Sequence, residues 1–155
     1  MKPISASLIV ALLAVSATGK DGHCIFRLHA EANPRDTAVF SSSVRASFSG
    51  KQVAIERIPR LSERDVVAFY PYSASDGSYG ALFQLDEHGR VALDALSVER
   101  RGTLLFVLIN GRPITELLID RRVSDGQIYI PSGLTKADID LMKKDWRLIG
   151  EKKKR

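Results

Sequence analysis

The sequence predicts an α+β domain, with a mixed or antiparallel sheet and about two main helices on one face. Three observations predict it. Short apolar or alternating segments recur along the chain, two longer segments have helix-start and helix-stop signals, and one Asn-Gly pair joins two of the strands. The 155 residues, 45% hydrophobic and 26% charged, have the size and composition of one globular domain.

Residues 1–19 predict a secretory signal peptide that is cleaved after Ala17 or Gly19. A positive start at Lys2 is followed by the apolar run 4–15 and then by small residues. A helix over residues 4–17 would rise roughly 21 Å, which is short of the roughly 30 Å hydrocarbon core of a bilayer. A membrane anchor is therefore the weaker interpretation, and we expect an exported domain at residues 20–150.

The first strand is predicted at residues 24–31, where apolar and polar side chains alternate. Cys24 falls on the apolar side, so we expect a buried thiol. The alternative in an oxidising compartment is a disulfide to another chain. His29 falls on the polar side without a second metal ligand at suitable spacing, so no metal site is expected there.

The next segment has weaker signals. Residues 33–50 are rich in serine and predict a loop with at most a short strand near Val39. Residues 51–58 alternate again and predict a strand that ends at Pro59. Ser62 with Asp65 has the spacing of a capping box, which predicts one helical turn. Aromatic residues and a polar loop over 73–78 follow.

The central part of the chain has the strongest local signals. Residues 79–85 predict a strand. Asp86 opens a helix whose stop is Gly102, since glycine takes the left-handed conformation that ends many helices. Residues 103–109 are apolar on both faces, which predicts a strand in the centre of a sheet.

Asn110-Gly111 is the strongest two-residue hairpin signal, because a type I′ turn needs positive φ at both positions. It predicts a return strand over 112–120, and a further short strand follows at 127–130. Thr135 has an acid three residues later and predicts the cap of a last helix that ends near residues 149–150.

The net charge of +5 is concentrated at the C-terminus. Residues 151–155 contribute +3, whereas residues 18–150 together carry only +1. This body lacks the basic, aromatic-rich face of a nucleic-acid-binding protein, so no nucleic acid partner is expected. The flexible basic tail is expected either to be solvated or to make a weak contact with an anionic surface.

The order of elements over residues 79–149 resembles the head subdomain of the first periplasmic domain of SecD, an export-motor membrane protein. The matching points are the apolar strand, Gly102, and the turn residues Asn110 and Gly111, all of which have structural roles. The resemblance implies the fold, here in a small exported stand-alone protein, and a contact with polypeptide. It implies no catalytic residue.

The sequence thus predicts a protein- or peptide-binding module of the cell envelope, with no cofactor and no catalytic or metal site. An unpaired sheet edge would accept an extended segment, with Tyr70 and Tyr72 as neighbours. The alternatives are a small hydrolase-like envelope enzyme that uses His29 or Asp86, and an adaptor held at the envelope surface by its tail. No Gly-x-Ser-x-Gly nucleophile motif supports the enzyme.

Overall fold

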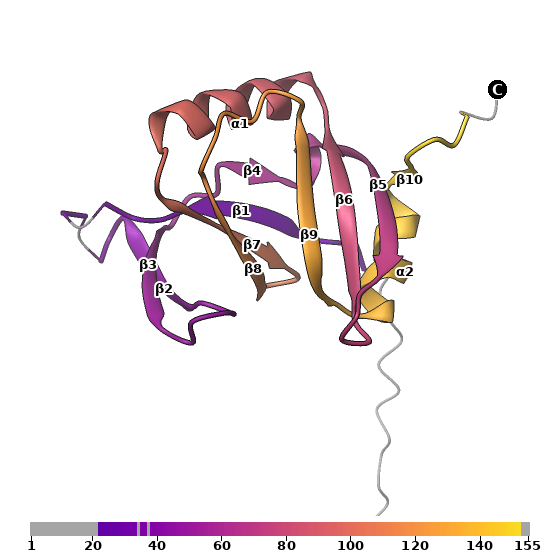
Figure 1. Cartoon of the computed structure of the whole chain (residues 1–155), viewed down its shortest axis with the longest axis horizontal. Helices are drawn as coiled ribbons and strands as arrows, with labels where there is room; N and C mark the ends of the chain where they lie inside the picture. Colours follow the sequence, from indigo (N-terminus) through magenta and orange to yellow (C-terminus); the bar gives the residue numbers. More distant parts are fainter. Residues whose placement is uncertain (1–21, 34, 37, 153–155) are drawn as a thin grey trace, which may run out of the picture.

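The computed structural model describes residues 22–33, 35–36 and 38–152 and confirms the α+β class (Figure 1). The predicted signal peptide at 1–19 and tail residues 153–155 lie outside the described residues. Within the described part, no helix is long and apolar enough to cross a bilayer.

Within the described residues, the strands form two four-stranded sheets and a two-stranded ribbon. The first sheet has the order β4-β1-β7-β8 and the second the order β10-β5-β6-β9, while β2 and β3 form the ribbon. The elements are β1 (Phe26–Ala30), β2 (Ser41–Arg45), β3 (Gln52–Glu56), β4 (Leu61–Ser62), η1 (Glu63–Asp65), β5 (Val66–Ser73), β6 (Tyr79–Leu85), α1 (Glu87–Glu99), β7 (Leu104–Ile109), β8 (Arg112–Leu118), β9 (Gln127–Leu134), α2 (Lys136–Asp145) and β10 (Arg147–Leu148).

The first sheet is covered on both faces. Its inner face contributes Leu28 and Val107 to the main core, which also contains residues of the second sheet and of both helices. Its outer face is covered by the ribbon, where Ile55 packs with Phe106 in a small separate cluster. This double coverage confirms β7 as a central strand, and it explains why that strand is apolar on both faces.

An aromatic cluster joins the second sheet to β1 and to the end of α2. The ring of Phe83 lies 5.2 Å from Phe26, 6.4 Å from Phe69 and 5.9 Å from Trp146. All four side chains are buried. The core therefore lies against the inner face of the second sheet, and α2 closes one end of it.

The caps predicted from local sequence are confirmed. Asp86 accepts a hydrogen bond from the N–H of Gly89 at 2.7 Å and starts α1, and Gly102 follows that helix with φ +85°. Asn110 and Gly111 have φ of +51° and +79°, as a type I′ turn requires. Thr135 and Asp138 form the predicted capping box of α2.

Three predicted strand boundaries are wrong. The strand expected near Val39 lies at Ser41–Arg45, because the serine run pairs with β3 and one side of this ribbon needs no apolar side chains. The segment 66–73 is strand β5 rather than a lead into a loop. β9 extends past the predicted 127–130 to Leu134, because it keeps pairing with β6 across an irregularity in register.

The predicted end of the last helix is also wrong. The helix stops at Asp145, because Trp146 takes extended φ/ψ angles of −128° and 146° and places its ring in the core. The next residues, Arg147 and Leu148, pair with β5 as β10. Asp145 accepts the N–H of Cys24 at 2.6 Å, which fastens the beginning of the domain to its end.

Candidate functional site

The outer face of the second sheet carries exposed aromatic side chains. Cross-strand pairing places Tyr70 opposite Leu82, and Leu82 opposite Tyr129, so these three side chains form one row. Tyr70 is 54% exposed and Tyr129 is 55% exposed. Tyr72 belongs to the same face, and we call these four residues the tyrosine face.

The side chain of Tyr72 extends over the neighbouring strand β6 and reaches Tyr129 of β9. Its ring stacks on Tyr129 with centroids 5.5 Å apart and planes 12° apart, and its hydroxyl donates to the carbonyl of Ile130. A Cβ at Gly80 would overlap the Tyr72 ring, so only glycine leaves room for it. Burial, and after it the interaction with the neighbouring Tyr129 hydroxyl, raises the pKa of Tyr72.

The sequence prediction that named Tyr70 and Tyr72 missed the other half of this face. Both residues lie on the outer side of β5 rather than over the core. Leu82 and Tyr129 lie beside them only because β5, β6 and β9 pair in this register. The alternation of exposed Tyr129 with buried Ile128 and Ile130 was the local signal that could have identified the third tyrosine.

The two long edges of this sheet differ. Along β5, β10 covers the residues up to Phe69, whose carbonyl accepts the N–H of Ile149 at 2.9 Å. Main-chain groups alternate in direction along a strand, so the next outward position is Pro71, which has no N–H to offer. At Pro71 the β5 edge therefore has no main-chain donor for an added strand.

The edge at β9 keeps its hydrogen-bonding groups. Leu85 donates to the carbonyl of Gly126 at 2.8 Å, which places the main-chain groups of Ile128 toward β6. Those of Tyr129 then point away from the sheet, on a side where no strand of the described residues pairs with β9. Farther on, Gly133 lies against Ile114 of β8, so the open part of the edge is short.

A groove of about 490 Å³ lies beside the open part of this edge. Segment 121–125 forms its other wall, and Leu82 and Tyr129 also line it. Arg122 is held by Asp94 through two hydrogen bonds of 2.5 and 2.8 Å. The groove therefore joins outward main-chain groups, an aromatic ring and an apolar side chain in one concave site.

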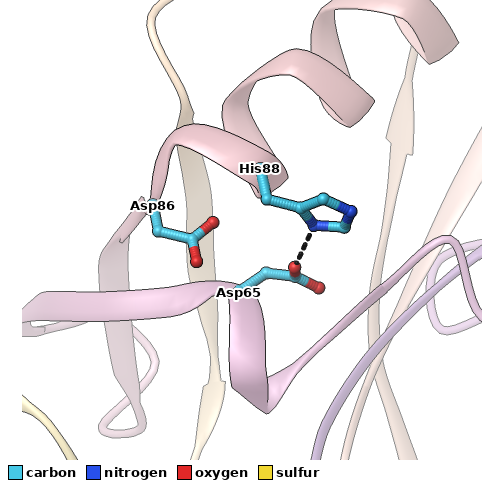
Figure 2. Close-up of side chains that lie close together, drawn as sticks. All are labelled: Asp65, Asp86 and His88. Atoms are coloured by element: carbon cyan, nitrogen blue, oxygen red, sulfur yellow. Dashed lines mark hydrogen bonds and ion pairs between the residues drawn. The ribbon is translucent and has the colours of Figure 1, made fainter.

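A second cluster contains Asp65, Asp86 and His88 (Figure 2). One ligand atom from each lies within 4.8 Å of the others, a spacing that could hold a metal ion. The carboxylates, however, have structural hydrogen bonds. Asp65 lies 2.9 Å from Nδ1 of His88 and accepts the N–H of Ser62 at 2.8 Å, while Asp86 caps α1. The Asp65 hydrogen bond raises the pKa of His88.

The residues named for an enzyme are not brought together. His29, expected on the polar side of its strand, is buried because the ribbon covers that face, and its Nδ1 lies 2.8 Å from the carbonyl of Glu56. Asp86 is a helix cap. Cys24 is buried, as expected, and burial raises its pKa to about 12, with smaller contributions from Asp138 and Asp145. This protonated thiol is a poor nucleophile.

No protein-family model matches the chain, and no curated protein matches it. Among solved structures, SecDF, described as a membrane component that enhances protein export, matches with a TM-score of 0.54 and 14% identity. That match covers 86% of this chain and 70% of the SecDF chain. SecDF in a super-membrane-facing form gives a TM-score of 0.48 and 10% identity over 86% of this chain and 31% of that chain. The first comparison shows that the chain has a SecD-like α+β fold.

Proposed function

We propose that this chain is an exported, non-enzymatic module of the cell envelope that binds an extended segment of another polypeptide. The segment adds to the second sheet at the β9 edge, beside Tyr129, and its side chains contact the tyrosine face. The observation that carries the proposal is the outward main chain of Tyr129 above a groove of about 490 Å³.

The geometry favours β9 over β5 as the docking edge. Main-chain hydrogen bonds provide affinity in strand addition, and Pro71 removes the donor that the β5 edge would need. At β9 the donor of Tyr129 is present, and the neighbouring aromatic rings offer large, rigid contact area. Tyrosine is enriched in protein interfaces because its ring is apolar and its hydroxyl tolerates water.

Two further observations support the cellular setting. The sequence of residues 1–19 has the layout of a cleaved signal peptide. The fold is similar to that of SecDF, which acts in protein export. Together they favour a role outside the cytoplasmic membrane, in contact with polypeptides there.

The test compares two variants of one residue. Tyr129→Ala removes the ring and keeps the outward N–H, whereas Tyr129→Pro removes both. The quantity to measure is the affinity of each variant for a reduced, carboxymethylated protein that cannot refold, determined by fluorescence anisotropy. Tyr129→Ala should weaken binding, and Tyr129→Pro should weaken it about fivefold further, since one hydrogen bond is worth about 1 kcal/mol.

Val91→Ala is the matched control, because Val91 is an exposed apolar residue on α1, away from this face. Thermal melting must show that every variant is folded. Equal affinities for the alanine and proline variants would exclude the main-chain contact at β9. Failure of the unmodified protein to bind the unfolded probe would contradict the proposed function itself.

A further inference from the structure

The ribbon and its two ends, residues 35–36 and 38–60, contain four large apolar side chains that are exposed. Val39, Phe40, Phe48 and Ile58 are 67%, 65%, 71% and 78% exposed. Both exposed phenylalanines of the described chain are among them. The ribbon lies on the side of the molecule away from β5 and β6 (Figure 1), so this surface is separate from the tyrosine face.

Three of these side chains line one groove. Val39, Phe40 and Ile58 surround a space of about 630 Å³, in which Asp36, Glu56, Arg57 and Arg60 are the charged residues. The groove has fixed walls. Arg57 donates from its main chain to the carbonyl of Phe40 at 3.0 Å and from its guanidinium to the carbonyl of Ala38 at 2.9 Å.

The charge of this region differs in sign from that of the remaining domain. Residues 35–60 contain five basic and two acidic residues, a net charge of +3. The remaining residues of 18–150 contain thirteen basic and fifteen acidic residues, a net charge of −2. The domain is therefore polarised, and four of its exposed large apolar side chains lie in the positive region.

At the opposite end of the ribbon, the turn between β2 and β3 leaves the side chain of Phe48 exposed. The N–H groups of Ser47 and Phe48 donate to the carboxylate of Glu116 at 2.9 and 2.8 Å. These two hydrogen bonds hold the turn in place while the side chain of Phe48 stays exposed. Arg45 and Lys51 flank it, both exposed, and among the described residues no acidic side chain pairs with either.

We propose that residues 35–36 and 38–60 form a docking surface for an anionic phospholipid bilayer. The apolar side chains enter the interfacial layer, and the basic side chains contact the phosphate groups. Charge complementarity selects this occupant, because the net +3 region faces outward and the remainder is net negative. This inference stands independently of polypeptide binding at β9.

The test measures co-sedimentation of the protein, purified after export, with two kinds of vesicle. One is phosphatidylcholine alone and the other contains equal parts of phosphatidylcholine and phosphatidylglycerol. We expect binding to the anionic vesicles at low ionic strength, weaker binding at physiological salt, where the screening length is about 8 Å, and little binding to neutral vesicles.

Two variants examine the two parts of the surface. Arg45→Glu with Lys51→Glu should weaken anionic binding at least about 25-fold, because each basic residue at a charged bilayer contributes about fivefold. Phe40→Ser with Ile58→Ser should weaken it at least about fivefold. These side chains are exposed, so both variants should melt at the temperature of the unmodified protein.

Matched controls are Val91→Ser with Val98→Ser, exposed on α1, and deletion of residues 151–155. The α1 control should bind fully, and the tail deletion should keep most of the binding. All variants share one N-terminus, verified by intact mass. The inference is overturned if the ribbon variants bind like the controls, or if the protein ignores vesicles and binds soluble polyglutamate, which would indicate an acidic protein partner.

Discussion

Gly80→Ala tests the packing of the tyrosine face directly. The added Cβ would overlap the ring of Tyr72, so that ring must leave its place over β6. The displacement removes its stacking on Tyr129, worth about 0.5–1.5 kcal/mol, and its hydrogen bond to Ile130, worth about 0.5–1.5 kcal/mol. Alanine in a strand recovers about 0.5–1 kcal/mol relative to glycine. The net loss should be about 0–2.5 kcal/mol, centred near 1 kcal/mol.

The assay is a double-mutant cycle by urea denaturation, with Tyr72→Ala as the second change. In the Tyr72→Ala background the ring is gone, so Gly80→Ala should stabilise the protein by about 0.5–1 kcal/mol instead of destabilising it. The change of sign is the diagnostic result. If Gly80→Ala has the same effect in both backgrounds, Tyr72 does not lie over Gly80 and this reasoning fails.

Three further predictions follow from other contacts. Gly111→Val should lower the free energy of unfolding by roughly 1–3 kcal/mol, because valine is strained at φ +79°; an unchanged denaturant midpoint would show that the turn tolerates it. Since Asp65 raises the pKa of His88, this pair stabilises the fold fully below about pH 6.5, and the contribution should be lost as the pH rises through the raised value; His88→Gln should abolish that dependence in melting curves. Deleting residues 151–155 should leave the melting temperature unchanged, because the sequence beyond Gly150 has no apolar side chain to pack; unfolding on deletion would show a packed tail.

The sequence predicted best the elements whose signals are local. Asp86, Gly102, Asn110 and Gly111 act through the backbone of their own neighbours, so α1 and the β7–β8 hairpin were predicted nearly to their ends. The end of α2 was not, because Trp146 leaves the helix to pack against the rings of Phe69 and Phe83, which belong to two strands of the second sheet. The extended conformation of Trp146, which ends the helix, therefore arises from tertiary packing.

The candidate site was predicted in part for the same reason. Alternation around Tyr70 and Tyr72 could suggest a shared face, but the stacking of Tyr129 on Tyr72 depends on the register of two strand pairs. The direction of the main chain at residue 129 likewise depends on which neighbours β6 pairs with. Such properties of a sheet edge appear only once all strands are placed.

The hydrogen bond between Asp145 and the main chain of Cys24 joins the residues just before the first strand to the end of the last helix. The first strand begins beside the end of α2, and the two residues that this hydrogen bond joins are 121 positions apart in the sequence. The contact can form only after Asp145 has been synthesised, so the beginning of the first strand lacks this partner until nearly the whole domain is present.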